Sequence, residues 1–123
     1  LDILNDPQGS IIDKGGCIFI ALDNELAVGT AGLAKKNDSE YELVKMAVDP
    51  AMRGKGIGKI LLNNCLEKAK NLKAEKLSLF SNSKLQTALK LYEQFGFTYV
   101  DLKDNPLLTA DIKMELSLIN NLV

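Results

Sequence analysis

The sequence predicts an α/β (α+β) domain with a mixed central sheet and helices that cover it. Three observations support this class. Residues 17–34 have the pattern of a strand hairpin, residues 41–102 alternate strand, helix, strand, helix and strand, and a last strand pattern follows at 112–118. The 123 residues are about enough for one compact domain, so residues 1–123 are expected to form a single unit.

The first half of the chain is expected to be mostly antiparallel. Residues 1–14 are interpreted as the remnant of a helix followed by a loop, because apolar residues precede a proline and a glycine. Residues 17–22 and 26–34 flank the turn 23–25 and contain Ile, Val and Thr, which predicts a hairpin. Residues 41–48 alternate in polarity and predict a strand, one face of which is formed by Glu42, Val44, Met46 and Val48.

The second half is expected to alternate helices and strands. Apolar residues recur at helical spacing over 58–72, which predicts a helix with one apolar stripe. Ser83 and Gln86 have the spacing of a capping box, and Gly96 is suited to close the helix that begins there. Strands are expected at 77–80, 97–102 and 112–118, and an exposed edge on the last would allow pairing into a homodimer.

Composition excludes several classes of function. The chain has no His, which argues against catalytic triads and metal sites built on His, and no metal is expected. Its formal net charge of −1 disfavours general binding to nucleic acid or to an anionic membrane. No apolar run is long enough to span a membrane, and Cys17 and Cys65 are expected to be reduced core thiols of a cytoplasmic protein.

A glycine-rich loop at residues 53–59, Arg-Gly-Lys-Gly-Ile-Gly-Lys, carries the clearest sign of chemistry. Alternate glycines let backbone N–H groups face outward, and the helix start adds unpaired N–H groups and the positive end of a dipole. A phosphate or pyrophosphate site is therefore expected there. The spacing fits neither the dinucleotide fingerprint nor the nucleoside-triphosphate loop. A surface turn with solvated basic residues is the alternative.

Arg53, Gly56 and Gly58 also fit a second pattern: Gln or Arg, two residues, Gly, one residue, then Gly or Ala. Together with residues 42–50 and 91–97, this motif resembles the GNAT superfamily of acetyl-CoA-dependent N-acetyltransferases. The first segment is similar to the central strand of that family, and the second to its later helix-to-strand signature. The likeness covers most of the chain and is nearest to small bacterial-type members, with part of the usual N-terminal region lacking.

The resemblance implies a mostly antiparallel sheet with one splayed parallel pair, at 41–48 and 77–80. The pantetheine arm of acetyl-CoA would lie between these strands, against backbone groups of Met46, Ala47 and Val48. The pyrophosphate would be held by the loop, whose residues are Arg53, Gly54, Lys55, Gly56, Ile57, Gly58 and Lys59.

Two side chains are candidates for proton transfer. The resemblance implies that Tyr92 protonates the departing CoA thiolate, and the alternative is a core tyrosine at helical spacing. Glu42 lies where some members of the family place a base that takes a proton from the incoming ammonium. The alternative is a strand glutamate paired with a lysine.

The chain departs from the family pattern seven residues before the tyrosine. Many relatives carry there an Asn that contacts the pantetheine, and this chain has Leu85. Asn82 is the candidate substitute for this cofactor contact, and an ordinary helix-entry residue is the alternative. Cys65 falls on the apolar stripe of a helix, so a covalent acetyl-cysteine step is not expected.

The expected function is transfer of the acetyl group of acetyl-CoA to a primary amine, by direct attack in a ternary complex. The acceptor, a small molecule, peptide or protein, stays open. Two other functions are consistent with the sequence: a non-catalytic acyl-CoA-binding or partner-binding module of the same fold, and a phosphate-binding regulatory domain.

Overall fold

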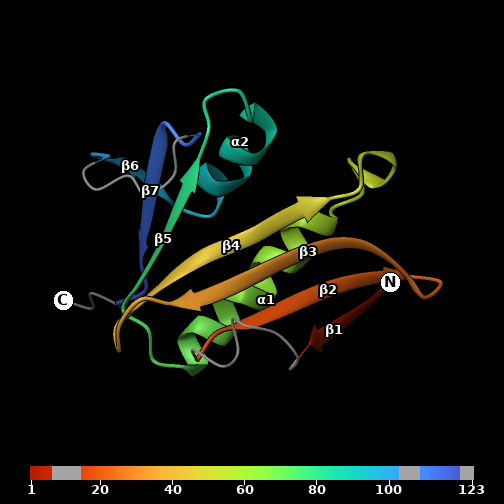
Figure 1. Ribbon diagram of the computed structural model, residues 1–123, viewed down its shortest axis with the longest axis horizontal. Helices are drawn as coiled ribbons and strands as arrows, with labels where there is room; N and C mark the ends of the chain where they lie inside the picture. The colour runs from red at the N-terminus through yellow and green to blue at the C-terminus, as the bar shows by residue number, and fades with distance from the viewer. Residues whose placement is uncertain (7–14, 103–108, 120–123) are drawn as a thin grey trace.

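The computed structural model describes residues 1–6, 15–102 and 109–119, which form one seven-stranded sheet (Figure 1). The strand order is β1-β2-β3-β4-β5-β7-β6, and every neighbouring pair is antiparallel except β4 and β5. The mixed class predicted from the sequence is therefore confirmed. The strands are β1 Asp2–Asp6, β2 Cys17–Asp23, β3 Leu26–Lys35, β4 Glu40–Val48, β5 Lys76–Ser81, β6 Thr98–Val100 and β7 Ile112–Ser117.

The N-terminal residues form a strand, so the predicted helix remnant is wrong there. β1 pairs antiparallel with β2, with Asp2 opposite Leu22 and Asp6 opposite Ile18. The free edge of β2 offers backbone partners to this short segment, and such pairing outweighs a weak local propensity. The loop predicted to follow lies partly in residues 7–14, which are outside the described residues.

The parallel pair opens after three residue pairs. β4 and β5 are in register at Glu40 with Lys76, Tyr41 with Leu77 and Glu42 with Ser78. Beyond this point the two strands diverge, as Figure 1 shows. Lys76 also ties the closed end together, with its Nζ 3.5 Å from Glu40 Oε1 on β4 and 3.4 Å from a carboxylate oxygen of β7. The predicted splay is confirmed.

β4 contains a bulge that changes the predicted faces. Val44 pairs with Gly32 and Ala47 with Thr30, so two residues of β4 oppose one of β3, and Lys45 has a φ of 57°. An extra residue in one strand reverses the alternation beyond it. The prediction that Glu42, Val44, Met46 and Val48 share one face is therefore wrong.

The pairing of β4 with β3 shows toward which side of the sheet the side chains before and after the bulge point. Val48 is opposite Gly29, and a Cβ on Gly29 would lie 3.0 Å from Leu61, a residue of helix α1. Met46 and Val48, at the end of β4, thus point toward the helices. Glu42 and Val44, which precede the bulge, face the other side of the sheet.

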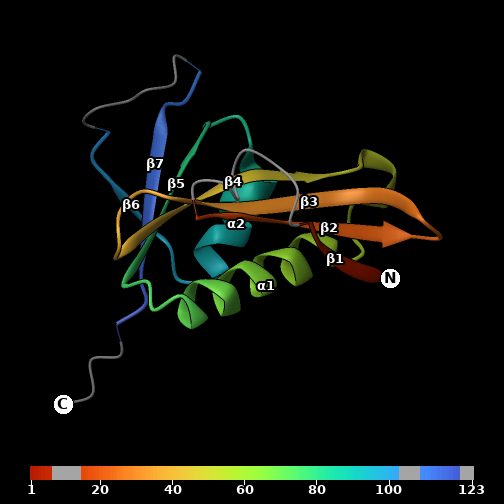
Figure 2. The same cartoon turned by 60° about the horizontal axis from the view of Figure 1, so that its bottom comes forward.

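Helix α1, Ile57–Asn71, agrees with the prediction and lies against β2, β3 and β4 (Figure 2). Its apolar stripe is buried and belongs to the main hydrophobic core. The stripe consists of Ile57, Leu61, Leu62, Cys65 and Ala69.

Among the described residues, no helix has the length and apolar character needed to cross a bilayer.

Helix α2, Gln86–Gln94, begins later than the capping box predicted. The Ser83 hydroxyl and backbone N–H instead donate hydrogen bonds of 2.7 and 2.8 Å to the carboxylate of Asp111. This long-range partner competes successfully for Ser83, so Leu85 becomes the N-cap without a side-chain bond. Gly96 ends the segment with a φ of 96°, as expected.

The C-terminal strand is an interior strand of the sheet. β7 pairs with β5 on one side, and its residues Lys113–Glu115 pair with β6 on the other. The prediction of an exposed edge along 112–118 is therefore wrong at Lys113–Glu115, and a homodimer stays a prediction. The strand predicted at 97–102 is present in a shorter form, as β6.

Candidate functional site

The glycine-rich loop presents a row of unpaired backbone donors. Within the described part of the chain, none of the N–H groups of residues 54–59 donates a hydrogen bond, and the first helical bond runs from Ile60 to Gly56. Gly54 and Gly56 have φ values of 81° and 80°, and no atom lies within 4 Å of a Cβ added to either. Open backbone N–H groups at a helix start form a binding site for an anion.

Close packing fixes the position of this helix start. A Cβ on Gly58 would lie 3.2 Å from Leu91 Cδ2 of α2 and 3.4 Å from Met46 Cε of β4. Gly58 therefore permits α1, α2 and the end of β4 to converge at one point. The short 3₁₀ helix η2, Pro50–Met52, leads into the loop, and the Asp49 carboxylate caps it by accepting from Ala51 N–H at 2.9 Å.

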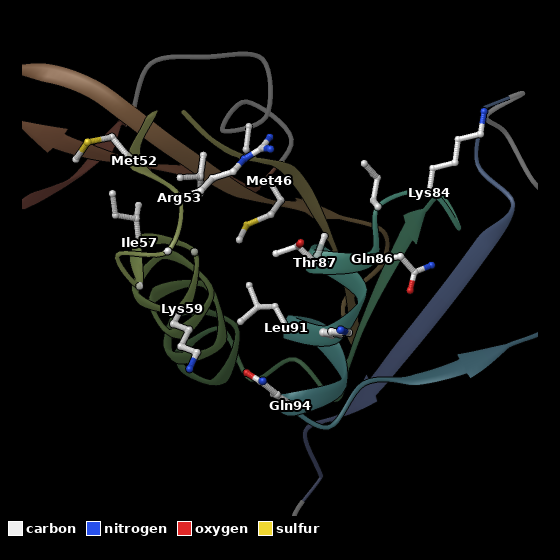
Figure 3. Close-up of a pocket in the computed structure, with 18 residues that line it drawn as sticks. Met46, Met52, Arg53, Ile57, Lys59, Lys84, Gln86, Thr87, Leu91 and Gln94 are labelled. Carbon is white, nitrogen blue, oxygen red and sulfur yellow. The ribbon is translucent and has the colours of Figure 1, made fainter. Parts of the chain in front are cut away.

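A cavity of about 590 Å³ opens where these elements meet (Figure 3). One wall is the end of β4 with the loop and the start of α1, and the other is α2 with the residues before it. The nine predicted cofactor-binding residues that line the cavity are Met46, Ala47, Val48, Arg53, Gly54, Gly56, Ile57, Gly58 and Lys59.

Lys55 and Asn82, predicted to bind the cofactor, do not line this cavity, and neither does Tyr92, predicted to act on the cofactor thiolate. The Lys55 ammonium lies 3.7 Å from the sulfur of Met52. The Asn82 side chain donates to the carbonyl of Thr109 at 2.6 Å and accepts from the N–H of Lys84 at 2.9 Å. Both ends of that amide are thus engaged at the entry of α2, and its cofactor contact stays a prediction.

Sequence reasoning missed the α2 wall of the cavity. Thr87, Leu91 and Gln94 recur at a spacing of four and three residues, which places them on one side of the helix. This spacing could have indicated a second functional face of α2, because Leu89 and Tyr92 already form the face that is buried in the core. The additional residues are Met52, Lys84, Leu85, Gln86, Thr87, Ala88, Lys90, Leu91 and Gln94.

Tyr92 lies in the core beside the cavity wall. Its side chain is 6% exposed and packs edge to face on Phe97, with ring centroids 5.8 Å apart. Burial, with a smaller contribution from nearby Cys65, raises the pKa of Tyr92 to about 12. The phenol therefore keeps its proton at neutral pH. Its catalytic role stays a prediction.

Glu42 lies on the opposite side of the sheet from α1. Its carboxylate is 3.2 Å from the ammonium of Lys36, and 17% of its side chain is exposed. An ion pair with a lysine was one of the two alternatives for this residue, and the pairing does not itself exclude the role of base. That role also stays a prediction.

The two thiols are poor candidates for a nucleophile. Cys17 and Cys65 are both free and buried. Burial raises the pKa of Cys17, and it raises the pKa of Cys65 to about 12, so little thiolate forms near neutral pH. Among the described residues, no group of three His, Cys, Asp or Glu side chains is placed to bind a metal.

Known proteins resemble this chain over most of its length. The profile described as "Acetyltransferase (GNAT) family" matches residues 3–97. The uncharacterized N-acetyltransferase YvbK of Bacillus subtilis is 33% identical over 99 residues, which cover 77% of this chain and 63% of that protein. The N-acetylaspartate synthetase of Rattus norvegicus is 35% identical over 122 residues, covering 98% of this chain and 40% of that one.

A solved structure also matches the fold. The crystal structure of a GNAT family acetyltransferase from Elizabethkingia anophelis, with acetyl-CoA bound, superposes with a TM-score of 0.74 and 25% identity. The match covers 93% of this chain and 86% of that one. The chain spans less than two thirds of the length of each of the two relatives named above.

Proposed function

The chain belongs to the GNAT family of acetyltransferases, and on that premise we propose that it transfers the acetyl group of acetyl-CoA to a primary amine. The observation that carries the proposal is the meeting of two features at one cavity. The unpaired N–H groups of residues 54–59 lie at its edge, and the end of β4, which has separated from β5, forms its wall. A diphosphate and a long amide-rich arm need these two features.

In this proposal the loop and β4 share the binding of acetyl-CoA. The loop N–H groups and the side chains of Arg53 and Lys59 bind the diphosphate. Met46, Ala47 and Val48 line the cavity beyond the last residue pair of β4 with β5, so their backbone groups are available to the amides of the pantetheine arm.

The transfer itself is a direct displacement. The nitrogen of the neutral amine forms a bond to the thioester carbonyl carbon, the carbon–sulfur bond breaks, CoA leaves as the thiolate, and the nitrogen loses one proton to water. Before this attack, the incoming ammonium must lose its own proton. Glu42 is proposed to accept that proton, directly or through water, and a backbone N–H near Val48 to stabilise the charge on the carbonyl oxygen. Tyr92 is proposed to donate a hydrogen bond to the departing sulfur.

The pKa of Tyr92 limits how its proton is used. A phenol with a pKa of about 12 is a much weaker acid than an ordinary thiol, so full proton transfer to the thiolate is unfavourable by about 4–5 kcal/mol. Donation of a hydrogen bond in a desolvated site needs no such transfer. The proposed role is therefore stabilisation of the thiolate as it forms.

The likeness to an N-acetylaspartate synthetase over 98% of this chain makes L-aspartate the first acceptor to test. The assay measures release of free CoA thiol from acetyl-CoA with L-aspartate, other amino acids, polyamines and peptide N-termini. Release that depends on the amine supports the proposal. Tight CoA binding without turnover across this panel would instead indicate a non-catalytic module, and stabilisation by nucleotides but not CoA would indicate a phosphate-binding domain.

A matched pair of variants tests the loop. Gly56 has a left-handed φ and open space around its Cβ position, and both Asp and Asn tolerate that conformation. Gly56→Asp adds a carboxylate at the proposed diphosphate site and is expected to weaken CoA binding by more than roughly tenfold. Gly56→Asn has the same size without the charge and is expected to bind more tightly than the Asp variant. Equal affinities would contradict the proposed diphosphate site.

A further inference from the structure

The cavity carries more positive charge than a diphosphate requires. Arg53 and Lys59 lie on the loop side, and Lys84 and Lys90 on the α2 side. No carboxylate is among the lining residues, and none of these four cations forms an ion pair with another described residue. This local excess of charge contrasts with a formal net charge of −1 for the whole chain.

The two α2-side lysines are not equivalent. Hydrogen bonds from Ser83 are the main cause that lowers the pKa of the Asp111 carboxyl, and the nearby charge of Lys84 contributes to the same shift. Figure 3 shows the Lys84 side chain directed away from the centre of the cavity. Lys90 forms no ion pair with another described residue, and Glu93, three residues further along α2, accepts a hydrogen bond of 2.8 Å from the Tyr99 hydroxyl, so the charge of Lys90 is available to a ligand.

The surface of α2 divides the cavity into two zones. Ala88 and Leu91 are partly buried, and Leu91 reaches toward Gly58. Thr87, Lys90 and Gln94 are spaced three and four residues apart along α2 and are exposed at the rim of the cavity. An apolar zone beside a polar, cationic rim suits a ligand with an amide and methylene arm and a second anionic group.

We propose that Lys90 binds the 3′-phosphate of CoA, which makes the protein selective for CoA over 3′-dephospho-CoA. This inference rests on the proposed function. The diphosphate of CoA carries about two negative charges, for which the loop amides, Arg53 and Lys59 are sufficient. The 3′-phosphate, a monoester, adds about 1.5 to 2 charges at neutral pH and needs its own cation.

The test compares the affinities for CoA and 3′-dephospho-CoA in three proteins: wild type, Lys90→Gln and Lys70→Gln. Lys70 is an exposed α1 residue outside the cavity, so its variant controls for the change in net charge. The wild type is expected to prefer CoA by roughly 3–10-fold, because an exposed ion pair with a dianion is modest in strength. Higher ionic strength is expected to reduce that preference.

Lys90→Gln is expected to lose most of the preference while its affinity for 3′-dephospho-CoA stays within about twofold of wild type. Lys70→Gln is expected to keep the wild-type preference for CoA. A wild type that binds both cofactors equally, or a Lys90→Gln variant that keeps the preference, overturns the Lys90 assignment and leaves the proposed function standing. Failure of the wild type to bind either cofactor overturns both.

Discussion

The hydroxyl of Thr30 on β3 donates a hydrogen bond of 2.6 Å to the backbone carbonyl of Lys45, across the bulge of β4. Lys45 is held at a φ of 57°, a conformation that costs a residue with a side chain on the order of 1 kcal/mol. The hydrogen bond therefore stabilises the bulge residue beyond which the side-chain alternation of β4 is reversed. Beyond it, Met46 and Val48 line the cavity.

Removal of this hydroxyl is expected to affect cofactor binding through the bulge. Thr30→Val keeps the shape of the side chain but loses the donor, and should lower the free energy of unfolding by about 1 kcal/mol. Affinity for acetyl-CoA should fall by roughly 3–10-fold, because the backbone groups of β4 lose their fixed orientation. Thr30→Ser keeps the donor and should restore both quantities. Wild-type affinity in the Val variant would show that Thr30 has no influence on the site.

Helix α1, helix α2 and the end of β4 converge at Gly58. A methyl group there would lie 3.2 Å from Leu91 Cδ2 and 3.4 Å from Met46 Cε, so Gly58→Ala is expected to push these side-chain ends toward the cavity. Because Ala also favours the helix, the free energy of unfolding should change by less than about 1 kcal/mol. Calorimetric titration with acetyl-CoA should show weaker binding. Leu91→Val removes one methylene from the crowded contact, and the double variant should regain part of the affinity. If the two changes are additive, the contact does not control the cavity.

Much of this arrangement could be predicted from the sequence because it depends on local patterns. The helical stripe of α1 and the glycine-rich loop need only neighbours in sequence, and both were correctly located. The bulge at Lys45 could not be found in this way. It depends on how β4 pairs with β3, and only that pairing shows that Met46 and Val48 are on a different face from Glu42.

Long-range partners explain the other differences. The capping box failed because Asp111, far away in sequence, bonds to Ser83. Residues 2–6 form a strand because they pair with the edge of β2. The last strand has a neighbour on its outer side because β6 pairs with it. These outcomes depend on tertiary contacts that a local pattern does not encode.

Substitution of Tyr92 tests its proposed role in the departure of the thiolate. Tyr92→Phe should lower the amine-saturated rate by roughly 10–100-fold and leave the affinity for CoA unchanged. Because the pKa of Tyr92 is about 12, the phenol stays protonated from pH 7 to 10, so the ratio of wild-type to variant rates should be constant there. A ratio that falls as pH rises through this range would contradict hydrogen-bond donation by a phenol of that pKa.

The buried thiol of Cys65 predicts a loss of stability at alkaline pH. Burial raises its pKa from 9.0 to about 12, so the folded state holds the proton more tightly than the unfolded state. Stability from this protonated form is complete below pH 9 and is lost as the pH rises toward 12, by about 1.4 kcal/mol at pH 10. Denaturant titrations at pH 8 and pH 10 measure this loss. Cys65→Ala should have a smaller decrease between the two pH values, and an equal decrease would assign the effect to other groups.

Glu42 and Lys36 separate the role of a base from that of an ion pair. If Glu42 accepts the proton of the ammonium, Glu42→Gln should lower the amine-saturated rate most at low pH, where more of the amine is protonated. Lys36→Gln breaks the same 3.2 Å ion pair but keeps the carboxylate.

The Lys36 variant should therefore stay near the wild-type rate, and the free energies of unfolding of both variants should fall by less than about 1 kcal/mol, since the Lys36 side chain is 44% exposed. Rate profiles from pH 6 to 9 distinguish the two roles. A Glu42→Gln profile that parallels wild type, or equal losses of rate in the two variants, would assign Glu42 to the ion pair alone.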